Sequence, residues 1–371
     1  MSTRPNAWFP MTDRPSPIRN GLRLAQYSVG QSAKVGWYTA QYLASRHAAG
    51  PFTSPGRVPR PYRARPAPPR EVRRAFFRLF AEEAADIAAG RYRVPADLRT
   101  PPDLRALLAQ ARRYYEEAGT ISRRAHRRGG AVETRKIAPA GLPSYYVQNF
   151  HFQSDGWLSD PSAEIYDTQV ESLFTGAADT MRRRGLPLLL DEIDRVAGEE
   201  GRAPVLVDIG CGTGRLLADC LVNRPHVDAF GLDLSTAYLR VARNHVGRDR
   251  AAFIQAPAEQ LPFADHSVDI LFSVYLFHEL PAKVRERVAA EFSRVLKPGG
   301  YYLHIDSVQY GDTAMDIMLE GFPRAVHEPY YDAYCRQDLD ALFASGGFAR
   351  VEGDERIAFL TKVTPYRRCE A

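Results

Sequence analysis

The middle of the chain reads Val205-Leu206-Val207-Asp208-Ile209-Gly210-Cys211-Gly212-Thr213-Gly214-Arg215. A short run of strand formers breaks into alternating glycines, after which leucines recur at helical spacing, so the pattern predicts a strand, a tight loop and a helix. Glycine suits a loop that comes close to a ligand, because it has no Cβ and readily adopts positive φ. The pattern disfavours NAD, since the dinucleotide fingerprint has its third glycine one place later, where Arg215 stands here.

Further segments follow this loop in a fixed order. Residues 229–235 read as a second strand that ends in Asp233, whose carboxylate can accept two hydrogen bonds from the vicinal hydroxyls of a ribose. Next come residues 259–265, which contain Leu-Pro-Phe, the apolar strand 268–274, and residues 294–300, which end in Pro-Gly-Gly before another strand. Strands and helices alternate from here on, which predicts a parallel sheet with helices on both faces.

With these motifs in order, the segment from about Val205 to Ser307 resembles the class I S-adenosylmethionine (SAM) dependent methyltransferases. It is most similar to the methyltransferase type 11 branch, which includes the quinone C-methyltransferases. The resemblance implies an α/β fold with a Rossmann-like, seven-stranded, mostly parallel sheet. It also implies SAM as the cofactor and S-adenosylhomocysteine as the product.

In that family the glycine loop lines the methionine part of SAM, the acid after the second strand holds the ribose, and the segment before Leu-Pro-Phe covers the adenine. The resemblance therefore implies cofactor contacts from Asp208, Gly210, Gly212, Gly214, Asp233, Leu234, Ala258, Glu259 and Ser273. One position departs from the family pattern. Pro257 stands where an acid is usual, which leaves the backbone amide of Ala258 as the candidate for contact with the adenine.

The catalytic residues are less clearly indicated, because methyl transfer from a sulfonium needs mainly positioning and exclusion of water. Sites in open α/β sheets lie at the carboxyl ends of the strands, which selects the residues after the fourth strand. His278 stands there, and its ordinary pKa of about 6.5 suits a base near neutral pH. His151 is the second candidate. Each histidine can instead be a hydrogen-bonded structural residue. No metal site is expected, since the four cysteines lack metal-ligand spacing.

Residues 143–159 fit neither the helical nor the strand period. Their five aromatic rings alternate with polar side chains, which predicts either buried packing or a segment that closes over a pocket. The acceptor contacts predicted from this segment and from the later insertion are Tyr145, Tyr146, Phe150, Trp157, His327 and Tyr330. Aromatic faces suit a planar, apolar or cationic acceptor. The helix predicted over residues 163–184 leads into the core.

The whole chain has 371 residues, of which 45% are hydrophobic and 25% charged, the proportions of a folded protein. We expect three parts: a basic, Pro/Arg-rich arm with one amphipathic helix over 1–69, a helical region with the aromatic segment over 70–165, and the methyltransferase domain over 166–371. The arm contains a single acid and can be a solvated tail, a transit peptide or a contact with an anionic or membrane surface. No apolar run reaches the ~20 residues of a membrane span, and a cytoplasmic protein is expected.

Three functions remain open at this point. The first is methyl transfer from SAM to a small organic acceptor, on oxygen, nitrogen or carbon. The second is a SAM-binding pseudoenzyme that acts as an interaction module through its long helical front. The third, methylation of nucleic acid, is disfavoured because Ser273-Val274-Tyr275-Leu276 lacks the prolines found after the fourth strand in enzymes that methylate base amino groups. The sequence indicates neither the acceptor nor the oligomeric state.

Overall fold

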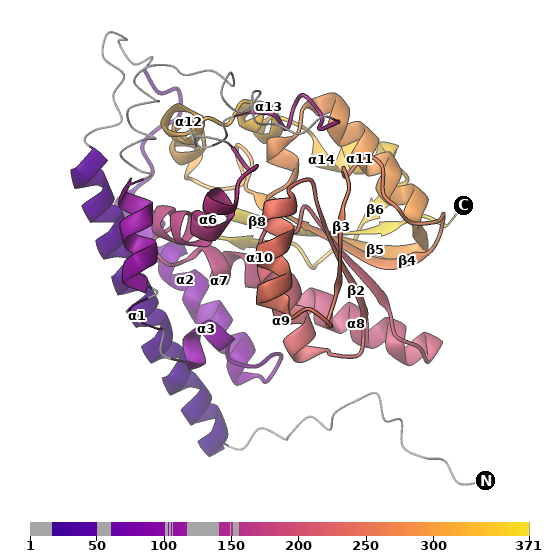
Figure 1. The fold of residues 1–371 in the computed structure, drawn as a ribbon, viewed down its shortest axis with the longest axis horizontal. Coiled ribbons are helices and arrows are strands. Elements are labelled where there is room, and N and C mark those ends of the chain that lie inside the picture. The colour runs from indigo at the N-terminus through magenta and orange to yellow at the C-terminus, as the bar shows by residue number, and fades with distance from the viewer. Residues whose placement is uncertain are drawn as a thin grey trace.

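The computed structural model describes residues 17–49, 61–100, 103, 105, 107–116, 141–148, 150 and 156–370. Its centre is a sheet with helices packed on both faces (Figure 1). The strands are β1 (Val205–Ile209), β2 (Asp228–Asp233), β3 (Ala252–Gln255), β4 (Val268–Val274), β5 (Leu296–Ser307), β6 (Phe348–Arg350), β7 (Arg356–Ala358) and β8 (Thr361–Arg368). They follow the order β3-β2-β1-β4-β5-β8-β6, and β7 pairs with β8 outside this path.

Strands β1 to β5 are parallel, and β8 runs antiparallel to β5 and β6. This confirms the predicted Rossmann-like α/β class, with one difference at its end. The described residues form eight strands where seven were predicted, because the chain reverses at Phe359, where φ is 60°, and thereby separates β7 from β8. The turn escaped prediction because neither Phe359 nor Leu360 is a residue that usually marks a two-residue hairpin.

The two faces of the sheet are covered by different helices. On one face, α8 (Leu186–Glu200), α9 (Arg215–Asn223) and α10 (Thr236–Val246) bury a core with residues of β1, β4 and β5. On the other face, α11 (Ala282–Val295), α13 (Tyr331–Cys335) and α14 (Leu339–Ser345) pack against Val207 and Leu271. The strand order reverses between β1 and β4, so the loops after these two strands meet at the carboxyl edge, where open α/β sheets bind ligands.

The remaining helices flank the sheet at the side of this edge (Figure 1). They are α1 (Pro17–Ala49), α2 (Pro69–Ala88), α3 (Ala96–Arg99), α6 (Asp160–Leu173), α7 (Ala178–Arg183), the 3-10 helix η2 (Phe277–Glu279) and α12 (Asp316–Ala325). The predicted helix over 163–184 is therefore two helices. It breaks before Ala178 because α1 passes there: Gly176 has φ +83°, and a Cβ on it would lie 2.9 Å from the Cα of Val35.

Helix α1 contacts α2, α3 and α6 along its length. Gly30 permits this approach, because a Cβ there would lie 2.6 Å from the carbonyl oxygen of Leu98. The Gln31 amide donates to the carbonyl oxygen of Gly176 at 2.9 Å. These contacts cross the expected boundaries at residues 69 and 165, and the division into three parts stays a prediction. None of the helices in the described ranges combines the length and apolar character that a membrane crossing requires.

Candidate functional site

The glycine loop after β1 adopts the left-handed conformation that its sequence requires. Gly210, Gly212 and Gly214 have φ values of 68°, 52° and 72°, a region costly for residues with a Cβ. The loop is tied to the end of β2 through Asp233. One carboxylate oxygen of Asp233 accepts from the backbone N–H of Gly212 at 2.9 Å, and the other accepts from that of Ser235 at 2.8 Å. The acid is thereby fixed beside the loop.

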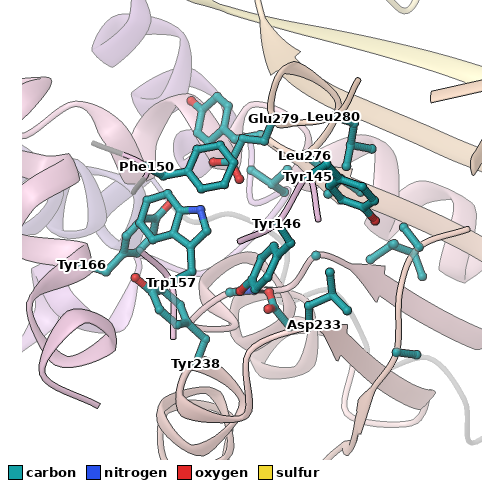
Figure 2. Close-up of a pocket in the computed structure, with 18 residues that line it drawn as sticks. Tyr145, Tyr146, Phe150, Trp157, Tyr166, Asp233, Tyr238, Leu276, Glu279 and Leu280 are labelled. Carbon is teal, nitrogen blue, oxygen red and sulfur yellow. Dashed lines mark hydrogen bonds between the residues drawn. The ribbon is translucent and has the colours of Figure 1, made fainter. Parts of the chain in front are cut away.

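A first cavity of about 780 Å³ opens beside the glycine loop and the end of β2 (Figure 2). Its lining combines the loops after β1, β2, β3 and β4 with the aromatic segment and with Tyr166 and Tyr238. Five of the predicted cofactor residues line it: Gly210, Gly212, Asp233, Leu234 and Ala258. The structure thus brings the central part of the predicted cofactor site together in one place.

Four predicted cofactor residues lie elsewhere. Gly214 precedes α9, where a Cβ would meet Val246 and Ala242. Glu259 accepts a hydrogen bond from the Tyr145 hydroxyl, at 2.9 and 2.7 Å from its two oxygens. Ser273 is fully buried within β4, and its hydroxyl lies 2.8 Å from that of Tyr302.

Asp208 lines a smaller cavity on the other side of the glycine loop, together with Arg182, Thr213 and Arg215. Its carboxyl group is buried, and its Oδ1 has no hydrogen-bond partner among the described residues. Burial, and then the nearby Asp233, raise the pKa of Asp208 well above its ordinary value. A buried acceptor without a donor is costly, so this oxygen favours a ligand that brings a donor or a positive charge.

The four predicted acceptor residues of the aromatic segment, Tyr145, Tyr146, Phe150 and Trp157, line the first cavity beside Asp233 (Figure 2). Trp157 stacks on Phe150 with ring centroids 5.7 Å apart. Its carbonyl oxygen accepts from the Ser235 hydroxyl at 2.5 Å, which fastens the segment to the end of β2. These rings therefore stand next to the predicted cofactor residues.

Of the other predicted contacts, Tyr330 packs against the cluster that contains Phe150 and Trp157. His327 and Tyr330 line neither the first cavity nor the second cavity described below. His151 lies outside the described residues.

A second cavity of about 650 Å³ adjoins the first. Apolar side chains of α6 and α12 and the β7–β8 hairpin form its walls, and Ser307, His278, Glu279 and Tyr275 give it a polar end. Three residues, Tyr166, Tyr275 and Glu279, line both cavities. The two spaces therefore meet at the end of β4.

His278 lies at this junction on η2 and is almost fully buried. Its Nδ1 is 2.5 Å from Asp306 at the end of β5, and Asp306 also accepts from the backbone N–H groups of Phe277 at 2.8 Å and Ser307 at 2.7 Å. Burial lowers the pKa of His278, but the Asp306 carboxylate outweighs it and raises the pKa to about 9. The imidazole is therefore protonated at neutral pH and acts as a donor in that state.

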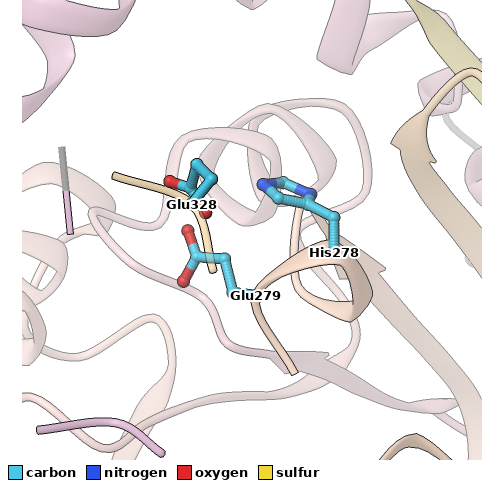
Figure 3. A group of neighbouring side chains, drawn as sticks. All are labelled: His278, Glu279 and Glu328. Carbon is cyan, nitrogen blue, oxygen red and sulfur yellow. The ribbon is translucent and has the colours of Figure 1, made fainter. Parts of the chain in front are cut away.

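His278, Glu279 and Glu328 gather close together, with their ligand-type atoms all within 4.8 Å of one another (Figure 3). This spacing would admit a cation, which would have to displace the proton of His278. Burial, and then repulsion from Glu328, raise the pKa of Glu279 well above its ordinary value. We interpret the group as an acid–base cluster, and the absence of a metal stays a prediction.

Sequence reasoning missed several residues at the site. Tyr275 lines the first cavity and has a positive φ of 57°. Its position directly after β4 was the only sequence feature that could have indicated a role at the site. Tyr166 lies on α6, whose pattern is that of any packing helix, and carried no local signal. Glu328 comes from a segment 49 positions after Glu279, and nothing in the sequence indicated that the two would meet.

Comparison with known proteins finds similarity to methyltransferases in the segment that forms the sheet. Residues 207–304 match a family described as a methyltransferase domain. The methyltransferase GfsG of Streptomyces halstedii is 30% identical over 187 residues, which cover 49% of this chain and 59% of that protein. The malonyl-(acyl-carrier protein) O-methyltransferase of Methylococcus capsulatus is 35% identical over 153 residues, which cover 41% of this chain and 54% of that protein.

These matches span less than two thirds of either relative. Among solved structures, the YcgJ protein from Bacillus subtilis is 18% identical with a TM-score of 0.38, covering 50% of this chain and 98% of that chain. The family match falls on the segment from β1 to β5 that carries the glycine loop and Asp233. Residues 207–304 are therefore similar to the methyltransferase domains of known proteins.

Proposed function

We propose that the protein is a SAM-dependent methyltransferase that transfers a methyl group to a small organic acceptor. The observation that carries the proposal is the fixed Asp233 carboxylate beside the left-handed glycine loop at the edge of the sheet. Each of its oxygens accepts one backbone N–H and keeps a lone pair for a ribose hydroxyl.

The surrounding residues fit the rest of SAM. The unpartnered Oδ1 of Asp208 suits an ammonium group, and Arg182, which lines the same small cavity, suits a carboxylate. Gly212 lines the first cavity and also the smaller cavity that contains Asp208. A Cβ on Gly212 would meet no atom of the described residues within 4 Å, so the space is left for a ligand. The apolar side chains of Ala258 and Leu280 line the first cavity farther along, where an adenine ring would be accommodated.

SAM supplies a methyl group that is already activated by the sulfonium. The chain's own contribution is to hold the reactants and to exclude water, which the rings of Tyr166, Tyr238 and Trp157 do at the wall of the first cavity. The second cavity is a concave, largely apolar space, which favours a small organic acceptor over a polymer.

A direct test is to incubate the full chain with SAM labelled in its methyl group and with an extract separated into small molecules, protein and nucleic acid. We expect label in the small-molecule fraction. Asp233→Ala should abolish this transfer, whereas Asp228→Ala, at an exposed position of the same strand, should leave it unchanged. Label in nucleic acid alone would contradict the proposal. SAM binding without transfer to any fraction would instead indicate a pseudoenzyme.

A further inference from the structure

We propose that the second cavity binds the methyl acceptor, and that this acceptor is an uncharged, largely apolar organic molecule that presents a hydroxyl or another acidic X–H group to Glu279. The inference rests on the proposed function, because it places the acceptor relative to the first cavity. It goes further in that it names a separate site, a chemical class of ligand and the residue that accepts the proton.

The two cavities share the residues between which a methyl group would pass. Tyr166 from α6, Tyr275 after β4 and Glu279 from η2 line both spaces. Tyr275 is held in place by two contacts: its N–H donates to the carbonyl oxygen of Ile305 at 2.8 Å, and its hydroxyl lies 2.6 Å from that of Thr361. Among the described residues, these three side chains therefore stand between the second cavity and the first.

The walls of the second cavity are apolar. Leu173 and Phe174 come from the end of α6, Met318 and Phe322 from α12, and Leu360 from the turn of the β7–β8 hairpin. Burial of apolar ligand surface against such walls stabilises the complex in proportion to the apolar area removed from water. The site thus favours a molecule with an extensive apolar body and only one polar end.

The charges at the polar end of the cavity determine which polar group of a ligand can be buried there. His278 is the cationic group among the described lining residues, and Asp306 already neutralises it at 2.5 Å. Glu279 and the neighbouring Glu328 place two more carboxyl groups there, and burial and then repulsion from Glu328 raise the pKa of Glu279. An anionic acceptor would be buried beside these carboxyl groups, and among the described lining residues it would find only the His278 cation, which Asp306 already neutralises, so its burial is strongly unfavourable. A neutral X–H group instead finds an acceptor for its hydrogen bond.

Glu279 is the proton acceptor best placed for such a group, because it lines both cavities whereas His278 lines only the second. In the reaction, the X–H proton passes to the Glu279 carboxylate and the lone pair of X forms the bond to the methyl carbon. The electrons of the broken S–C bond return to sulfur, which gives the methylated acceptor and S-adenosylhomocysteine. The raised pKa of Glu279, caused by burial and by Glu328, makes this carboxylate a stronger base than an exposed one.

Two fluorescent probes test the class of ligand without any turnover. N-phenyl-1-naphthylamine is neutral and apolar, and 8-anilino-1-naphthalenesulfonate has the same rings with one negative charge. Titrated into the full chain, the neutral probe should bind at least about tenfold more tightly than the sulfonate. Glu279→Gln should narrow this difference, because it replaces a carboxyl group that can ionise with a neutral amide that can donate a hydrogen bond to the sulfonate. Equal or tighter binding of the sulfonate would overturn the inference.

The location is tested with substitutions that fill the cavity from two different helices. Leu173→Trp and Met318→Trp should each weaken binding of the neutral probe by about tenfold or more. The control Leu108→Trp, at a side chain that is 54% exposed elsewhere, should not. S-adenosylhomocysteine should bind all three variants like the unaltered chain, which also shows that they fold.

The outcomes separate the two claims. If S-adenosylhomocysteine binds but neither tryptophan changes the affinity for the neutral probe, the acceptor site is misplaced while the proposed function stands. If S-adenosylhomocysteine does not bind the unaltered chain, the proposed function itself fails, and the acceptor assignment fails with it.

Discussion

At the scale of single residues, the site concentrates conformations that cost free energy. Tyr275 has a φ of 57°, in the left-handed region that costs a non-glycine residue about 1–2 kcal/mol. The surrounding hydrogen bonds to Ile305 and Thr361 hold it there. Strain of this kind collects at functional sites, where it positions a side chain that a relaxed backbone would not. Here it directs the chain past the junction of the two cavities.

The glycine loop allows a matched test at this scale. Gly212 and Gly299 both have positive φ, of 52° and 71°, and a Cβ on either would meet no protein atom within 4 Å. Alanine at either position should therefore cost a similar amount of stability, about 1 kcal/mol in thermal unfolding. Only Gly212→Ala should also weaken binding of S-adenosylhomocysteine, by about tenfold, because only Gly212 lines the first cavity. Equal binding by both variants would show that the loop does not contact the cofactor.

Local sequence motifs predicted those residues of the first cavity that lie in the glycine loop or at the end of the neighbouring strand. Gly210, Gly212 and Asp233 lie within 24 positions of one another and were predictable, because strand ends and glycine loops carry a direct signal. Glu328 and Tyr166 reach the site from distant parts of the chain through tertiary packing. Their sequence surroundings resemble ordinary loop and helix, so no local pattern indicated them.

At the scale of elements, α1 shows the limit of prediction from sequence: its helical structure was predicted, but its packing partners were not. The apolar spacing predicted a helix, but not that the helix packs closely against α3 and the α6–α7 turn. A glycine weakens an isolated helix, but in α1 the missing side chain of Gly30 allows the helix to approach Leu98 closely. The partner of an amphipathic face is a property of the whole fold and cannot be read from the face itself.

Lys34 makes this contact testable. Its ammonium lies 2.9 Å from Asp97, 2.7 Å from Glu171 and 2.7 Å from Asp179, and it is largely buried. Burial lowers the pKa of Lys34, but the three carboxyl groups outweigh it and raise the pKa well above its ordinary value. Lys34→Met removes the cation that these three acids share and breaks the ion pair of the buried Glu171, although Asp179 keeps its pair with Arg182 at 2.7 Å, and it should reduce the free energy of unfolding by about 3–5 kcal/mol.

The measurement is equilibrium unfolding in urea, with Lys283→Met on the exposed side of α11 as the control. The control should change the free energy of unfolding by less than about 0.5 kcal/mol. If both variants unfold at the same urea concentration as the unaltered chain, α1 is not fastened through Lys34.

At the scale of the whole molecule, the mostly parallel sheet with helices on both faces was predictable, because strands and helices alternate along the chain. The cavities were not predictable in the same way. The second cavity is assembled from α6, η2, α12 and the β7–β8 hairpin, which span nearly 200 residues of sequence. Its apolar character appears only once these elements are placed together.

Calorimetric titration of the full chain with S-adenosylhomocysteine tests the central claim, that the cavity beside Asp233 is the cofactor site. The unaltered chain should bind one equivalent. Asp233→Ala removes two charge-assisted hydrogen bonds and should weaken binding by about 2–4 kcal/mol, whereas Asp228→Ala, exposed on the same strand, should bind normally. Failure of the unaltered chain to bind, or undiminished binding by Asp233→Ala, would contradict the account.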